Sequence, residues 1–377
     1  MSTVLHLLGP GVEPVHAAEA ADAIAAEARG EGATPRPATA DDDAPGGVHR
    51  VVTLGPAAAA AAARAGLRVD AALHPPGLAA GAARVPFTAR ASLRRRLPAV
   101  TGGAEGAAGE PPAAVVAWDA SALAVASAFL LRTPRVLRLG ELPPPGEQVR
   151  LGALMASSGF DLAAAGEALR EALVAAGLPA GRVRVHPPSL DASRLPAAGA
   201  DGSGESGESG ESGGSGGDAA GPLRFAVAGG PGVDARPLVL AAALAQEAGG
   251  RRIELRLSPS AHRLAEALDV ADAAETSAGG GPRVTQDPAV ETPWRGFHEV
   301  DAALLPVGAP AHAARWAALA GVPRVFMQPQ TSFGLDPGEA RETDRVSRHP
   351  LPRDLAAAMT GVAAPPRAGG ASEEERE

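Results

Sequence analysis

A glycine-rich turn and an aspartate in the first half of the chain have the residue types of a ligand site. Gly9 and Gly11 follow the apolar run "TVLHLL" and precede an alanine-rich helical pattern. Backbone N–H groups at such a turn can bind a phosphate or another polar ligand, although the turn needs glycine for its backbone as well. Asp119 in "VVAWDAS" could orient a ligand hydroxyl or act as a base. An N-cap of the next helix explains it too, and we favour the cap.

A second glycine-rich turn occurs in "LRFAVAGGPGVDARP", again between an apolar run and a helical pattern. Its residues Gly229, Gly230 and Gly232 could approach a phosphate group, and Arg236 could clamp it with two parallel hydrogen bonds. The alternative is again that these glycines bind no ligand and are needed only for the backbone of a strand-to-helix turn.

The segment "PWRGFHEVD" is rich in aromatic and basic side chains for a chain with only 3% aromatic residues. Trp294 and Arg295 could contact a ligand, whereas packing within a loop is the alternative that we favour. No spacing of His, Asp and Glu along the chain suggests a metal site.

The segment "ARASLRRRL" predicts a basic amphipathic helix. Leu93 and Leu97 would lie on one face, and a helix of this kind could rest on anionic lipid, although a solvated surface helix is the default. The basic residues are Arg90, Arg94, Arg95 and Arg96.

Composition limits the classes of protein and partner. The net charge of −9 opposes nucleic acid as a partner. The chain has no lysine, so all its positive side chains except histidine are arginine. We attribute this to G/C-rich codon usage, so the many arginines are no evidence for nucleic-acid binding. The chain has no cysteine, which excludes a disulfide framework. Its first residues lack the features of a signal peptide, so we expect a cytoplasmic protein.

Short apolar runs alternate with alanine-rich helical patterns on both sides of a Gly/Ser/Glu repeat at Asp201–Asp218. This alternation predicts α/β architecture with two Rossmann-like, doubly wound parallel-sheet domains and a cleft between them. We expect an N-terminal domain at 1–200, a flexible linker at 201–221, a C-terminal domain at 222–362 and a disordered tail at 363–377. The linker would span roughly 20–24 Å.

The order of three segments resembles GT-B glycosyltransferases, especially retaining family 4. "DLAAAGEALREALVAAGLPAGRVRVHPPSLDASRL" resembles the end of their first domain, and "FAVAGGPGVDARPLVLAAALA" resembles the first strand, turn and helix of their donor-binding domain. "VDAALLPVGAPAHAARWAALAGVPRVF" resembles the family's signature strand and helix. The resemblance implies the GT-B fold with the donor's nucleotide and sugar between the domains. It also implies that the diphosphate lies at the second glycine-rich turn, the nucleotide base near Trp294 and Arg295, and the acceptor at the first glycine-rich turn, where Asp119 could orient a sugar hydroxyl.

Two signature glutamates of that family are replaced in this chain. The resemblance places Gly308 where the family's first glutamate contacts the sugar, and Trp316 where its second contacts the ribose. Neither can accept bidentate hydrogen bonds from hydroxyls. Trp316 could stack on a base or sugar, or could plug the start of the helix.

We therefore expect a divergent glycosyltransferase that moves a sugar from a nucleotide-sugar donor to an unknown hydroxyl acceptor, which could be lipid-linked. The nucleotide sugar would be a co-substrate, with no metal or other cofactor. The alternative from another class is a catalytically inactive GT-B relative that binds a nucleotide sugar or a protein, which the replaced glutamates favour. A third possibility is a different two-domain ligand binder.

Overall fold

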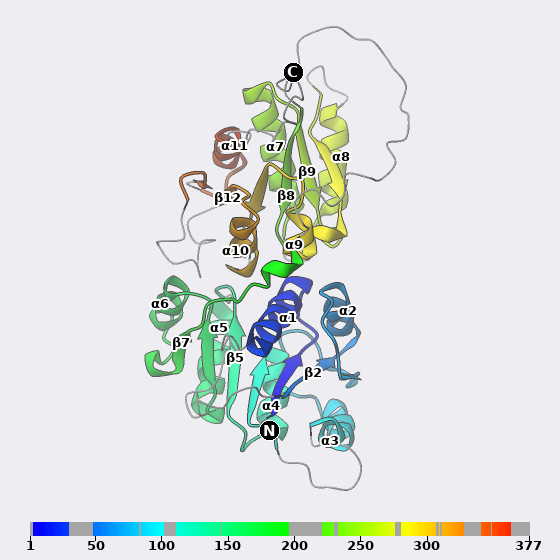
Figure 1. The fold of residues 1–377 in the computed structure, drawn as a ribbon, viewed down its shortest axis with the longest axis vertical. Coiled ribbons are helices and arrows are strands. Elements are labelled where there is room, and N and C mark those ends of the chain that lie inside the picture. The colour runs from blue at the N-terminus through cyan, green and yellow to red at the C-terminus, as the bar shows by residue number, and fades with distance from the viewer. Residues whose placement is uncertain are drawn as a thin grey trace, which may run out of the picture.

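The structure is a computed structural model. It describes residues 3–29, 48–82, 84–101, 111–143, 145–195, 221–229, 233–275, 280–306, 309, 311–327, 341–347 and 349–362. Two α/β domains follow one another along the chain (Figure 1).

The first domain contains a parallel sheet of seven described strands in the order β3-β2-β1-β4-β5-β6-β7. The order reverses beside β1, which is the feature that defines a doubly wound sheet. The strands are β1 (Thr3–Leu8), β2 (Val48–Leu54), β3 (Ala71–Leu73), β4 (Ala114–Ala117), β5 (Arg135–Leu139), β6 (Asp161–Ala164) and β7 (Val183–Val185). The helices are α1 (Pro14–Ala28), α2 (Pro56–Arg64), α3 (Phe87–Thr101), α4 (Ala120–Phe129), α5 (Pro145–Ser158), α6 (Glu167–Ala175), η1 (Ala180–Arg182) and η2 (Ala192–Arg194).

The second domain contains a parallel sheet of six described strands in the order β10-β9-β8-β11-β12-β13. The strands are β8 (Leu223–Val227), β9 (Ile253–Leu257), β10 (Arg283–Gln286), β11 (Ala302–Leu305), β12 (Arg324–Phe326) and β13 (Arg345–Val346). The helices are α7 (Ala235–Gly249), α8 (Leu264–Glu275), η3 (Pro288–Glu291), α9 (Pro293–Gly296), α10 (Ala311–Leu319) and α11 (Pro352–Thr360).

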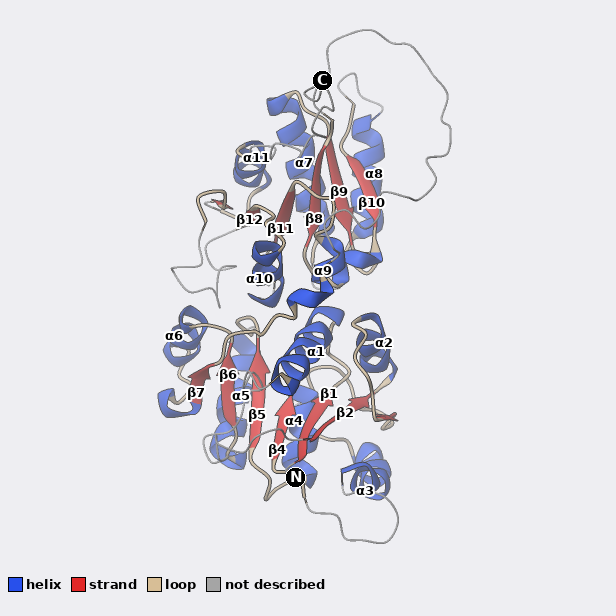
Figure 2. Ribbon diagram, viewed as in Figure 1, coloured by secondary structure: helices blue, strands red, loops and turns tan. Residues whose placement is uncertain are grey.

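Alternating residues of β1 show why helices cover both faces of the first sheet. Val4 and Leu8 join an apolar cluster with α1 and α2, whereas Leu5 and Leu7 join a second cluster with α3, α4 and α5. Successive side chains of a strand point to opposite faces, so both faces of this apolar strand are buried. Figure 2 shows the helices on both sides of the strands in each domain.

One apolar cluster continues from the first domain into the second. It includes Ala18 and Ala21 of α1 together with Trp294 and Trp316 of the second domain, all buried. The small side chains of α1 allow α10 and the two indole rings to pack closely on it. The domains are therefore joined by a packed contact as well as by the chain.

The predicted fold of two parallel-sheet α/β domains is confirmed. The strand, helix and strand expected in the signature segment are β11, α10 and β12. The described elements of the first domain end at η2 and those of the second begin at β8. The predicted linker, apart from Gly221, and the predicted tail lie outside the described residues.

Candidate functional site

The ends of central strands from the two sheets meet between the domains. The Ala311 N–H at the start of α10, which follows β11, donates to the carbonyl oxygen of Gly140, directly after β5, at 3.3 Å. The C-terminal ends of β5 and β11 therefore face each other. Ligands of doubly wound sheets bind at this end of the strands, so the candidate site lies here.

The first glycine turn is closed by Asp119. Its Oδ1 accepts a hydrogen bond from the Ala122 N–H at 2.7 Å, which caps α4, and its Oδ2 accepts one from the Gly11 N–H at 2.8 Å. A Cβ on Gly9 would lie 2.0 Å from Asp119 Oδ1, so no larger residue fits there. Burial raises the pKa of Asp119, and the two backbone N–H groups oppose this shift. Asp119 thus fixes the shape of the turn, and its two oxygens already have donors.

Glu141 is a candidate acid or base that the sequence interpretation missed. It follows β5 by two residues and is half-buried. Burial raises its pKa to about 7, the charge of His16 lowers it, and the charges of Glu13 and Glu147 raise it. A group with this pKa is protonated and deprotonated in comparable amounts at neutral pH, which suits proton transfer. The sequence did carry a signal for this residue, because Glu141 follows a predicted strand and ligands of parallel sheets bind at strand ends.

The second glycine turn is partly described. Gly229 is buried with φ at +121°, and a Cβ there would lie 2.5 Å from Val233 Cγ2, so the turn requires glycine. Arg236 lies in the first turn of α7, half of its side chain is exposed, and it lies 3.9 Å from Glu266. Gly230, Gly232 and Gly308 lie outside the described residues.

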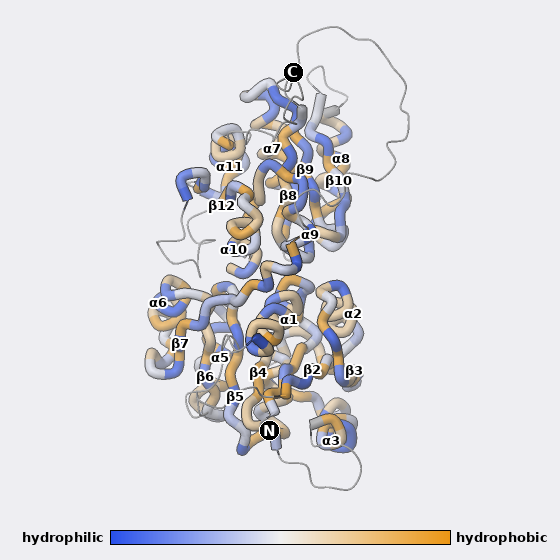
Figure 3. The backbone as a smooth tube through the Cα atoms, viewed as in Figure 1, coloured by the Kyte–Doolittle hydropathy of each residue, from blue (hydrophilic) through white to orange (hydrophobic). Residues whose placement is uncertain are grey.

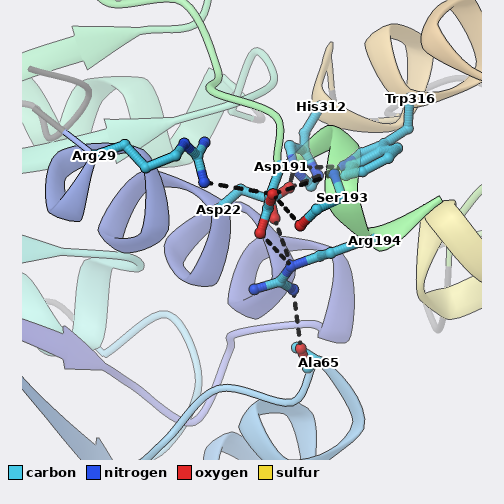
Figure 4. A network of polar contacts seen from close by, with 8 residues as sticks. All are labelled: Asp22, Arg29, Ala65, Asp191, Ser193, Arg194, His312 and Trp316. Atoms are coloured by element: carbon cyan, nitrogen blue, oxygen red, sulfur yellow. Dashed lines mark hydrogen bonds and ion pairs between the residues drawn. The ribbon is translucent and has the colours of Figure 1, made fainter. Parts of the chain in front are cut away.

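Trp316 points into the other domain. Its Nε1–H donates to Asp22 Oδ2 of α1 at 3.0 Å, and His312 Nε2 lies 2.8 Å from the same oxygen (Figure 4). Trp316, His312 and Asp22 are each fully buried. Donors from α10 therefore compensate a buried carboxylate on α1, as burial of a charge requires.

Residues of η2 complete this contact from the segment that leaves the first domain. Arg194 Nε lies 3.1 Å from Asp22 Oδ1, and its guanidinium lies over the Trp294 ring at 4.6 Å from the ring centroid. The rings of Trp294 and Trp316 are 5.5 Å apart. Trp294 is buried, whereas Arg295 is exposed. Both tryptophans proposed to line a nucleotide cleft thus pack between the domains.

A second ion pair crosses the domain boundary at Glu291 of η3. Its carboxylate accepts hydrogen bonds from Ser258 and Ser260 after β9 and from Arg64 of α2. These three donors outweigh the effect of burial and lower the pKa of Glu291. Glu291 is therefore a charged anchor for Arg64. Neither this pair nor Asp22 was singled out in the sequence.

Three further features concern metal binding, membrane spanning and the basic segment. The described ranges contain no group of three or more His, Cys, Asp or Glu side chains that could hold a metal ion. None of the described helices has the length and apolarity needed to cross a membrane. Arg90, Arg94, Arg95 and Arg96 lie on α3 and are exposed.

Comparisons with known proteins find similar structures but no match by sequence. No protein-family model matches the chain, and no curated protein matches it. A crystal structure of Anabaena Alr3699/HepE with UDP-glucose is similar with a TM-score of 0.60 and 14% identity, over 95% of this chain and 89% of that one. A Methanocaldococcus jannaschii UDP-GlcNAc 2-epimerase with UDP-GlcNAc and UDP gives 0.53 and 9%, over 96% and 92%. A glycosyltransferase from Rickettsia africae gives 0.55 and 8%, over 94% and 86%.

These similarities extend over both domains and define the class of fold. The chain has a GT-B-like fold, which is shared by proteins whose structures contain UDP or UDP-sugars. The similarity does not single out glycosyltransferase family 4 within that fold. At sequence identities this low, the similarity establishes the fold alone, and the reaction must be argued from the residues of the site.

Proposed function

We propose that this protein is a nucleotide-sugar-dependent enzyme, and specifically a divergent glycosyltransferase that transfers the sugar to a hydroxyl acceptor. The observation that carries the proposal is Glu141, whose pKa lies near 7 at the place where ends of the two sheets meet. A proton must leave the acceptor hydroxyl during transfer, and a half-buried carboxyl with this pKa can accept it. The UDP-sugars in similar structures support a nucleotide-sugar donor.

The donor would lie between the domains, with its diphosphate near the start of α7. Arg236 is exposed and has one distant ion-pair partner, so it is available to bind phosphate. Gly229 keeps the backbone close to that position, and Gly230 and Gly232 belong to the same proposed turn. Gly308 belongs to the proposed sugar side, and Arg295 is the exposed candidate for contact with the base.

The acceptor would lie on the first domain, near the Gly9–Gly11 turn. We assign Glu141 the role of base and Asp119 that of a positioning residue, because Asp119 already holds Gly11 and caps α4. Trp294 and Trp316 would support the donor side through the packing of α10 rather than by stacking on the ligand. We propose the cytoplasm as the compartment, on the absence of cysteine.

The first experiment is thermal unfolding of the full chain with UDP-, GDP-, ADP- and dTDP-sugars. A ligand at 100 times its dissociation constant adds about 2.7 kcal/mol to the free energy of unfolding, which raises the melting temperature measurably. We expect a shift with one nucleotide, and loss of that shift in Arg236→Ala. Arg283→Ala, which removes an exposed arginine of the edge strand β10 in the same domain, is the matched control.

Turnover then separates an enzyme from a binding protein. Release of nucleoside diphosphate from the stabilising donor should fall strongly in Glu141→Gln, while the donor-induced shift remains. A Glu141→Gln variant with the full rate and the wild-type pH profile would remove Glu141 from the mechanism.

The alternative is a catalytically inactive relative that binds a nucleotide sugar or a protein. It is favoured by the complete burial of Trp316, which takes the place of the family's ribose-binding carboxylate in the resemblance and packs on α1 instead. A thermal shift without diphosphate release from any donor and acceptor pair would support it. No shift with any nucleotide would contradict both nucleotide-sugar proposals.

A further inference from the structure

The surface of α3 is basic in a chain that is acidic overall. The stretch 71–104 contains no Asp or Glu, although the whole protein has a net charge of −9. The same stretch contains five arginines: Arg84, Arg90, Arg94, Arg95 and Arg96. Positive charge is therefore concentrated in one segment instead of being balanced locally.

The arginines of this segment make no polar side-chain contact with the part of the chain that the structure describes. The helix packs on the first sheet through Ala89, Leu93 and Leu97, which are buried, while all five arginines are exposed. Within the described residues, no hydrogen bond or ion pair joins any of their side chains to a partner. By contrast, Arg50 near the end of α3 donates to the Val100 carbonyl oxygen. Among the described residues, nothing neutralises the basic face of α3, which suits it to an anionic partner.

Phe87, the first residue of α3, adds an apolar group to this basic face. Its exposed fraction of 84% is the highest among the large hydrophobic residues that the structure describes. Residues three and four apart are neighbours on a helix, so Phe87, Arg90 and Arg94 follow one another along the surface. In Figure 3 the α3 tube carries both hydrophobic and hydrophilic colours. An exposed ring among cations is typical of a helix that lies in a membrane interface.

We propose that α3 docks the protein onto an anionic lipid bilayer. The guanidinium groups would bind headgroup phosphates, and the Phe87 ring would enter the boundary with the acyl chains. Phe87 favours lipid over single-stranded nucleic acid, because nucleic-acid surfaces stack successive bases on several aromatic rings. Phe87 is the one Phe, Tyr or Trp between residues 71 and 104.

The basic surface is connected to the candidate site by the loop that leads into α3. Ser121 Oγ, at the start of α4, donates to the Ala79 carbonyl oxygen at 2.8 Å and accepts from the Ala82 N–H at 3.2 Å. At the other end of the loop, Thr88 Oγ1 donates to the Pro76 carbonyl oxygen at 3.0 Å. Contact with lipid at α3 would therefore lie one loop away from the Asp119 turn, where a lipid-linked acceptor could enter.

The experiment is co-sedimentation of the full chain with vesicles, without any nucleotide sugar, so that its result is independent of the proposed reaction. We expect binding to phosphatidylcholine vesicles that contain roughly 30% phosphatidylglycerol, and none to pure phosphatidylcholine vesicles. High salt should release the protein, because counterions screen exposed charges.

Two variants and one matched control test the surface itself. Reversing the charge of Arg90, Arg94, Arg95 and Arg96 to Glu should abolish binding, since each arginine contributes roughly fivefold near an anionic surface. Phe87→Ala should weaken binding by about tenfold. The control reverses four exposed arginines of the second domain with the same change in net charge: Arg252, Arg283, Arg341 and Arg353. It should bind like the wild type.

Three results would overturn the proposal. One is equal binding of the wild-type protein to neutral and anionic vesicles, or no binding to either. Another is full binding by the charge-reversed α3 variant, with its native circular dichroism spectrum showing that it is folded. The third is that the wild-type protein binds RNA but not the vesicles. This result would show that the partner of α3 is a different polyanion.

Discussion

At the scale of single residues, local surroundings give three carboxyl groups different roles. Glu141 is half-buried with its pKa raised to about 7, whereas Asp119 accepts two backbone N–H groups. Glu291 has three donors that keep its pKa below the usual value. Of these three carboxyl groups, Glu141 has the pKa suited to proton exchange at neutral pH.

The raised pKa of Glu141 predicts a pH-dependent cost to stability. An unfolded glutamate loses its proton near pH 4.5, whereas the folded one keeps it up to about pH 7, so the folded state binds more protons in this window. The free energy of unfolding contributed by Glu141 therefore falls as pH rises from 4.5 to 7. We expect Glu141→Gln to be more stable than the wild type at pH 8 by on the order of 1–2 kcal/mol, and similar near pH 4.

Urea unfolding at the two pH values measures this difference. Glu171→Gln, at an exposed position of α6, is the control and should show the same free energy of unfolding as the wild type at both. If Glu141→Gln changes stability equally at pH 4 and pH 8, the assigned pKa is wrong.

At the scale of elements, strand and helix alternation was predictable from the sequence, and the partners of buried polar groups were not. The strand, turn and helix patterns around Gly9, Gly229 and Ala302–Leu319 are local, so residue spacing identifies them. Asp22 lies in an alanine-rich helix, where a carboxylate normally faces solvent. Its partner His312 is 290 positions away, and no local pattern indicates that pairing. Glu141 could have been identified as a candidate site residue from the sequence, because it follows a predicted strand.

We expect Asp119 to contribute more to the stability of α4 than to the proposed sugar transfer. In Asp119→Ala both the Ala122 N–H at the helix start and the Gly11 N–H lose their acceptor, and a lost N-cap costs about 0.5–2 kcal/mol. Asp119→Asn keeps one acceptor oxygen, so we expect a smaller loss. Urea unfolding of both variants measures the loss, and diphosphate release tests the role. Absence of turnover in a stable Asp119→Asn protein would instead make Asp119 catalytic.

At the scale of the whole molecule, buried charges make one folding unit of two domains. Across the boundary, Asp22 meets His312 and Trp316, and Glu291 meets Arg64. Separating the domains breaks these polar contacts together with the apolar packing around them. The contact therefore couples their unfolding.

We expect a single heat-capacity peak for the wild type and two separate transitions for Asp22→Ala. This change leaves His312 and the Trp316 N–H without their shared acceptor, at a cost of about 3–5 kcal/mol to the contact between the domains. Differential scanning calorimetry measures it. Glu167→Ala, which removes an exposed ion pair within α6, is the control. One undivided peak in Asp22→Ala would show that apolar packing alone couples the domains.

The packing of two indole rings between the domains also gives the molecule an optical signal of its own. The chain has three tryptophans and no tyrosine, so ultraviolet-excited emission comes almost wholly from indole. Trp294 and Trp316 lie 5.5 Å apart at the boundary, the latter against the Asp22 carboxylate and the His312 ring. Any separation of the domains would bring water to these rings and shift their emission to longer wavelength. Opening and closing can thus be followed in the unlabelled protein.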